Sequence, residues 1–186
     1  MTHRLDDVIA LFDGLFQDTF NTRLVRGDDE PLYRPADADC SFHRVIFAHG
    51  FYASALHEIS HWCIAGERRR RQEDYGYWYL PDGRDTEQQR AFETAEVVPQ
   101  ALELLFTRAC GWPFNVSVDN LGGEAAVDRD AFRGRVEARA VRYEREGLPA
   151  RAAAFHAALT AFYRDGRSLD DAVASGRDWL PSSLPA

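Results

Sequence analysis

The segment from His57 to His61 constrains this chain more than any other feature of its sequence. It reads His-Glu-Ile-Ser-His, so two histidines lie four residues apart and Glu58 follows the first. In a helix, residues four apart share one face, and the two imidazoles could therefore bind one divalent metal ion. The apolar pattern predicts such a helix over residues 51–65, after a break at Gly50. Glu58 is then placed to act as a catalytic base or to hold a water molecule.

A metal site of this kind needs a third ligand from elsewhere in the chain. Glu96 is our first candidate, 96 − 61 = 35 residues after His61 and in a separate predicted helix. Glu93 lies one turn earlier on much the same face, and His49 could approach from the residues before His57. The alternatives are that the two glutamates are solvated helix acids, and that His49 belongs to the core or supports a ligand. Two histidines and one carboxylate suit both iron that activates oxygen and zinc that activates water.

The composition is that of one folded domain covering residues 1–186. The chain has 30 acidic and 22 basic residues and a formal net charge of −8, which argues against general binding to nucleic acid. Its three cysteines are far apart, so we expect reduced thiols rather than disulfides or a cysteine-bound zinc. We see no signal peptide and no run of ~18 apolar residues, so we expect no membrane span and a cytoplasmic protein.

All the basic residues counted in that charge are arginines, and the sequence contains no lysine. Codon bias in a GC-rich genome is the simple explanation. A functional reading is that the protein's own surface cannot compete for chemistry directed at lysine.

Apolar periodicity divides the chain into helices and a few short strands. Pro99 is expected to kink or divide the longest helix. The segment after about residue 168 is expected to form one short helix and to be loosely attached. The predicted helices cover residues 5–20, 51–65, 86–110, 128–145 and 149–163, and the predicted strands or extended pieces cover 23–25, 32–34, 44–48 and 115–119.

Two segments after the metal helix are candidates for binding a substrate. Arg69 and Arg70 belong to a run of four arginines that could dock an acidic surface, although cations are also ordinary at a helix C-terminus. Tyr77 lies in an aromatic run that could line a channel for a cationic side chain or belong to the core. Asp82 could pair with an ammonium group or serve only a Pro-Asp-Gly turn.

The most distinctive segments of the chain are residues 20–24, 27–31, 49–66, 75–79, 81–85 and 113–117. Taken together, they closely resemble the elongation factor P hydroxylase family. The similarity covers about residues 5–163.

The resemblance implies an α+β fold similar to that of the metal-dependent endoribonuclease that matures ribosomal RNA. It also implies hydroxylation of a lysine on translation elongation factor P, after that lysine has received a β-lysyl group. His57 and His61 match the family's metal motif, and Glu96 is carried over as the third ligand. Hydroxylating an unactivated carbon needs a strong oxidant, so iron is the expected metal and dioxygen the expected cosubstrate. Glu58 would orient a ligand or relay a proton.

The same residues leave other activities open. In a zinc metallopeptidase, which is the main alternative, Glu58 would activate water on the metal. A metal-dependent nuclease rests on fold analogy alone, and the acidic charge counts against it. In a binding module without catalysis, a metal would only join two helices.

Overall fold

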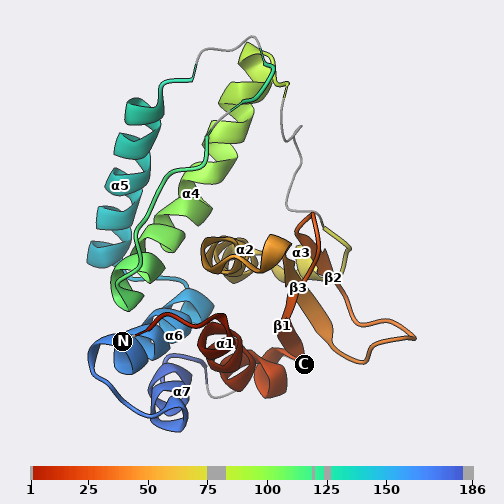
Figure 1. The fold of residues 1–186 in the computed structure, drawn as a ribbon, viewed down its shortest axis with the longest axis vertical. Helices are drawn as coiled ribbons and strands as arrows, with labels where there is room; N and C mark the ends of the chain where they lie inside the picture. The colour runs from red at the N-terminus through yellow and green to blue at the C-terminus, as the bar shows by residue number, and fades with distance from the viewer. Residues whose placement is uncertain (1, 75–82, 119, 124–126, 182–186) are drawn as a thin grey trace.

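A computed structural model describes residues 2–74, 83–118, 120–123 and 127–181 of the chain, and Figure 1 shows a small sheet at one side of a group of helices. This arrangement confirms the predicted α+β class in a single domain. Within the described residues, no helix is both long and apolar enough to cross a membrane. The elements are α1 (Leu5–Phe20), β1 (Thr22–Arg26), β2 (Leu32–Arg34), β3 (His43–Phe47), η1 (Ala48–Gly50), α2 (Tyr52–Ile64), α3 (Glu67–Arg70), α4 (Thr86–Cys110), α5 (Arg129–Glu146), α6 (Ala150–Leu159), η2 (Thr160–Arg164) and α7 (Leu169–Arg177).

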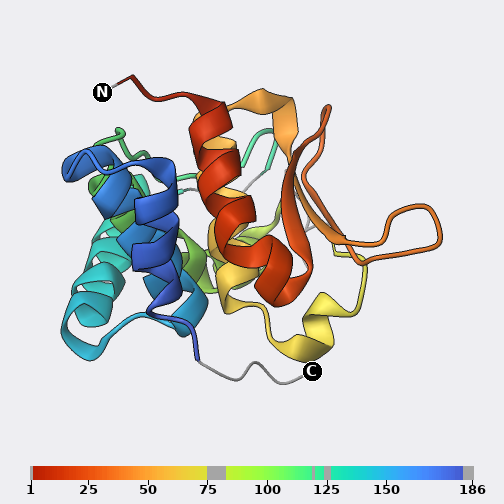
Figure 2. The same ribbon diagram turned by 90° about the horizontal axis from the view of Figure 1, so that it is seen from below.

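The sheet has β3 at its centre. β1 runs parallel to β3, with Val25 opposite Ile46, and β2 runs antiparallel to it, with Tyr33 opposite Val45. Figure 2 shows α1 beside this sheet, in line with the contacts between α1 and β1. The central strand is followed directly by η1 and α2. The sheet therefore fixes where the predicted metal helix begins.

Aromatic side chains hold α2 against the core. Phe12 and Phe16 of α1 are fully buried, and their ring centroids lie 5.1 and 4.7 Å from that of Trp62 on α2. Phe12 also contacts Phe155 of α6. Full burial of one such side chain stabilises a fold by about 1.5–3 kcal/mol. Because Trp62 follows His61 in the sequence, these contacts also fix the direction of the histidine face.

Arg151 of α6 secures the C-terminal end of α2. Its guanidinium donates hydrogen bonds to the carbonyls of Cys63 and Ala65 and lies 4.6 Å from the ring centroid of Trp62. The last carbonyls of a helix have no partner within it, so a cation here satisfies them and opposes the negative end of the helix dipole. Burial lowers the pKa of Arg151 to about 10, and the side chain is therefore still cationic at neutral pH.

α4 runs without interruption from Thr86 to Cys110, so Pro99 does not divide it. A proline inside a helix removes one hydrogen bond and costs about 3 kcal/mol or more. The residues that follow Pro99 are almost all buried, and α4 packs against α2, α5 and α6. This packing offsets the lost bond and keeps both halves of α4 in one helix.

α7, in the segment expected to be loosely attached, packs on α1 and α6. Ala172 and Gly176 are buried, and Arg177 donates to a carbonyl of α1. A Cβ atom at Gly176 would lie 2.6 Å from the carbonyl oxygen of Ala154, so this close approach depends on glycine. The predicted extended piece at 115–119 forms no strand over its described residues, 115–118.

Candidate metal centre

A tight turn between β3 and α2 sets the direction of the histidine face. His49 and Gly50 both have left-handed backbone conformations, with φ of 56° and 65°. Glycine adopts this conformation freely, whereas histidine does so at a cost. Further along α2, His57 and His61 lie one turn apart, and their Nε2 atoms are 3.1 Å from each other. Both rings therefore present a nitrogen to the same point.

α4 brings Glu96 to that point. Its Oε1 lies 3.2 Å from Nε2 of His61, and its Oε2 lies 3.7 Å from Nε2 of His57. One ligand atom from each of the three residues lies within 4.8 Å of the others. The Glu96 side chain is 2% exposed, against 18% for His57 and 13% for His61. The carboxylate thus approaches from the interior, and the two imidazoles lie nearer the surface.

The spacing of these atoms is compatible with one shared metal ion. Two ligands ~2.1 Å from an ion are roughly 3.0 Å apart at a right angle and roughly 3.4 Å apart at a tetrahedral angle. The separations of 3.1 and 3.2 Å around Nε2 of His61 agree with either arrangement. Two imidazole nitrogens and one carboxylate also leave coordination positions open for a reactant.

Glu103, which the sequence did not single out, supports His57 from the other side. Its Oε2 accepts a hydrogen bond of 2.8 Å from Nδ1 of His57. Because a carboxylate accepts, this bond places a proton on Nδ1, so Nε2 is the nitrogen that can bind a metal once it gives up its own proton. Glu96 and Glu103 are seven residues apart, with Gln100 between them, so all three share one face of α4. That spacing is the signal that could have identified Glu103.

Gln100 holds the Glu96 carboxylate in place. Its Nε2 donates to Oε2 of Glu96 at 3.1 Å and to the carbonyl of Ser117 at 2.7 Å. Its Oε1 accepts a hydrogen bond of 2.9 Å from the backbone N–H of Ser117. Gln100 is completely buried, so its amide is fixed by these three bonds. The segment around Ser117 thereby supports the centre without supplying a ligand.

Burial and charge act against each other on the ionisable groups of α2. Burial raises the pKa of Glu58, and the nearby imidazoles of His57 and His61 oppose this rise. For His57, burial acts to lower the pKa, but the hydrogen bond and charge of Glu103 outweigh it and raise the pKa to about 10. A glutamate whose pKa is raised towards neutrality suits proton transfer better than an ordinary surface acid.

Glu58 lines two cavities that differ in size and charge. One is an open groove of about 400 Å³, and its described lining includes His57 and the carboxylates of Asp29, Glu58 and Glu103. The other measures about 30 Å³, and its described lining includes His61, two arginines and the carboxylates of Glu58 and Asp74. The candidate centre is thus bordered by an acidic groove and by a smaller cavity of mixed charge.

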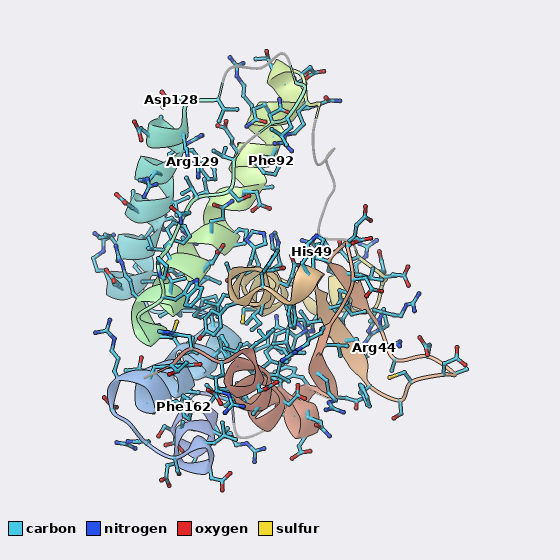
Figure 3. All side chains as sticks on the ribbon, viewed as in Figure 1. Arg44, His49, Phe92, Asp128, Arg129 and Phe162 are labelled. Carbon is cyan, nitrogen blue, oxygen red and sulfur yellow. The ribbon has the colours of Figure 1, made fainter. Side chains whose placement is uncertain are left out.

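The other two candidate ligands lie outside this group. Glu93 accepts a hydrogen bond from Gln89 and forms an ion pair with Arg135 of α5. The side chain of His49, labelled in Figure 3, is 51% exposed and lies 3.9 Å from Asp29. Its exposure rules out the core role considered for it. Among the described residues, the grouping of possible metal ligands consists of His57, His61 and Glu96.

The predicted substrate-binding residues are only partly described. Arg69 and Arg70 line the smaller cavity together with His61. Arg69 forms an ion pair with Asp74, and Arg70 donates to the carbonyl at residue 65 at 2.7 Å. Each guanidinium thus already has a partner inside the chain. Tyr77 and Asp82 lie outside the described residues.

The chain is similar to proteins of known family over most of its length. The model of a family described as elongation factor P hydroxylase matches residues 11–172, which include α2 and α4. A relative from Haemophilus influenzae named elongation factor P lysine hydroxylase is 49% identical over 163 residues, which cover 88% of this chain and 91% of the relative. The chain belongs to the elongation factor P hydroxylase family.

Proposed function

We propose that this protein is a metal-dependent oxygenase that hydroxylates a lysine of translation elongation factor P after that lysine has been β-lysylated. The observation that carries the proposal is the convergence of His57, His61 and Glu96, with ligand atoms within 4.8 Å of one another. The name of the Haemophilus influenzae relative supplies the substrate protein and the reaction. Because translation takes place in the cytoplasm, we propose a cytoplasmic location for the enzyme.

Iron is the metal we propose for this centre, and dioxygen the cosubstrate. Two histidines and one carboxylate with open positions are typical of non-haem iron(II) oxygenases, although zinc uses the same kinds of ligand. A bound redox-active metal would supply the oxidising chemistry. His57, His61 and Glu96 would bind the metal. Glu103 would orient His57 through the hydrogen bond at Nδ1.

Glu58 is the residue we propose to hold or transfer a proton during the reaction. It is half-buried on α2, next to His57, and it lines both cavities. Burial raises the pKa of its carboxyl, which brings the proton affinity of Glu58 closer to that needed at neutral pH. A Glu58→Gln variant should keep the metal and lose turnover by about 100-fold or more.

The decisive experiment measures the mass of modified elongation factor P after incubation with this protein, iron, air and a reductant such as ascorbate. We expect a gain of one oxygen atom on the β-lysylated lysine, and no gain with His57→Ala. Glu93→Gln is the matched control, because Glu93 also lies on α4 but pairs with Arg135. No gain under any reductant, together with zinc-dependent cleavage of casein, would favour the metallopeptidase.

Arg69 and Arg70 are proposed to dock an acidic surface of the substrate protein beside the smaller cavity. Reversing both charges should raise the KM for modified elongation factor P with little change in kcat, because docking precedes the reaction. The same reversal at Arg142 and Arg145 of α5 is the control. Tyr77 and Asp82 are proposed contacts of the cationic side chain, by cation–π interaction and by ion pairing. An unchanged KM after the reversal would remove the two arginines from the proposal.

A further inference from the structure

The open groove beside the candidate centre has the size and the charge to take a cationic side chain. It encloses about 400 Å³, and its described lining comes from the loop before β2, from η1 and α2, from α4 and from the segment 115–117. Three of these lining residues are acidic, namely Asp29, Glu58 and Glu103, and none of the described ones is an arginine. A groove lined with one sign of charge attracts ligands of the opposite sign.

The other cavity, which Glu58 also lines, is much smaller and its charges are mixed. Its volume of about 30 Å³ has room for one water molecule, and Arg69 and Arg70 lie in its wall. A β-lysylated lysine is too large for this space. The two arginines there also balance the carboxylates of Glu58 and Asp74, so this cavity lacks the net negative charge that attracts an ammonium group. Size and charge together therefore favour the open groove as the route to His57.

The chain fixes the acidic rim of the groove with backbone hydrogen bonds. The N–H of Gly27 donates to the carbonyl of Phe47 at 2.9 Å, and the N–H of His49 donates to the carbonyl of Asp28 at 2.7 Å. A Cβ atom at Gly27 would lie 2.4 Å from Cγ2 of Ile46, so only glycine lets the loop come this close to β3. The hydrogen bond from His49 thus joins the loop that carries Asp29 to the turn just before the metal helix.

We infer that the modified lysine enters through this groove, and that Asp29 at the rim selects it by pairing with an ammonium group of the β-lysyl extension. This inference rests on the proposed function, because it assigns a route to the same reaction. Asp29 has a highly exposed side chain, 93% in the absence of a substrate, so its carboxylate is available to an incoming cation. Glu103 extends the acidic wall inward to the hydrogen-bonded His57. Arg69 and Arg70 take no part in holding the side chain itself.

Kinetics with a small ligand separate this route from docking of the whole substrate protein. Free lysine that carries a β-lysyl group on its Nε atom should inhibit the reaction on modified elongation factor P. Asp29→Asn should raise the inhibition constant about three- to fivefold and Asp29→Arg about tenfold, with kcat retained. Asp39→Asn removes the same charge from the exposed loop between β2 and β3 and should change nothing. Charge reversal at Arg69 and Arg70 should also leave this constant unchanged.

Cross-linking tests the same contact without turnover. A carbodiimide joins a carboxylate directly to an amine, and this chain has no lysine that could react within the protein. With modified elongation factor P we expect the modified lysine to be linked to Asp29, and the yield to fall in Asp29→Asn. A link to Asp74, in the arginine-lined cavity, or unchanged inhibition in Asp29→Arg would overturn the inference. If the wild-type protein forms the Asp29 link but adds no oxygen, the proposed reaction fails while the groove assignment holds.

Discussion

Among the described residues, two histidine-containing clusters lie between α2 and α4, and one of them has the grouping of side chains that a metal site needs. In the first, His57 and His61 face Glu96 and Glu103. In the second, at the start of α2 and the end of α4, the Nε2 of His3 donates to the carbonyl of Cys110 at 2.6 Å. The partners of His3 are otherwise aromatic, with ring centroids of Tyr52, Trp112 and Tyr163 between 5.1 and 5.5 Å away.

The difference between these clusters lies in what α4 presents to α2. On α4, the hydrogen-bond partner of His3 is a backbone carbonyl, which is uncharged, and not a carboxylate. In the first cluster, one carboxylate orients His57 at Nδ1 and another faces both Nε2 atoms. Partial burial of a histidine is therefore a poor guide to metal binding, and a pair of carboxylates at helical spacing is a better one.

Removing the Glu96 carboxylate should have the largest effect. Glu96→Ala should weaken metal binding by more than about 100-fold and abolish hydroxylation, because a ligand and the interior charge are both lost. Saturating metal should raise the Tm of the wild-type protein by about 5–10 °C and leave that of the variant unchanged. Thermal melts with and without a chelator measure this difference. Equal shifts in both proteins would place the metal elsewhere.

Replacing Glu103 by glutamine should have an intermediate effect. The amide keeps the size of the side chain but loses the charge that orients His57 through Nδ1. Metal affinity, measured by isothermal titration calorimetry, should fall about 10- to 100-fold. Glu93→Gln removes a carboxylate of the same helix that pairs with Arg135, and should bind metal as the wild type does.

Truncating Gln100 should act more on stability than on metal binding. Gln100→Ala leaves the N–H and the carbonyl of Ser117 and one oxygen of Glu96 without their present partner. Unsatisfied buried groups of this kind cost about 1–3 kcal/mol each. With three such groups, chemical denaturation should show a loss of about 3 kcal/mol or more, and the metal affinity should fall only a few-fold. A loss of affinity as large as that of Glu103→Gln would show that Gln100 positions a ligand more strongly than its contacts suggest.

Changing His3 should have the smallest effect on the centre. His3→Ala removes one hydrogen bond and three ring contacts, and we expect the free energy of unfolding to fall by about 1 kcal/mol. Metal affinity and hydroxylation should not change, because the two clusters share helices but no side chain. A metal-binding defect in this variant would contradict the division between the clusters.

Local patterns in the sequence predicted most of the elements, and three residues named as candidate ligands, His57, His61 and Glu96, lie together in the structure. Helical periodicity placed α1 and α4 at their bounds, and the spacing of His57 and His61 placed them on one face. Tertiary packing determines which turn of α4 lies opposite His57 and His61 of α2. A local sequence pattern does not predict this alignment. The helical spacing shows that Glu103 shares a face with Glu96, but not that this part of the face reaches His57, and Glu103 was therefore missed. The assignment of metal and catalytic roles, and the likeness of the fold to the endoribonuclease, stay predictions.

The hydrogen bonds from Arg151 to the C-terminal end of α2 have a consequence for metal binding. The helix that carries both imidazoles is held by a guanidinium at one end and by the central strand at the other. Folding alone therefore brings the donor atoms together and restricts their rotamers. Loading the centre then requires little further ordering of the chain, and we expect the empty and loaded forms to share one backbone and to exchange metal without unfolding.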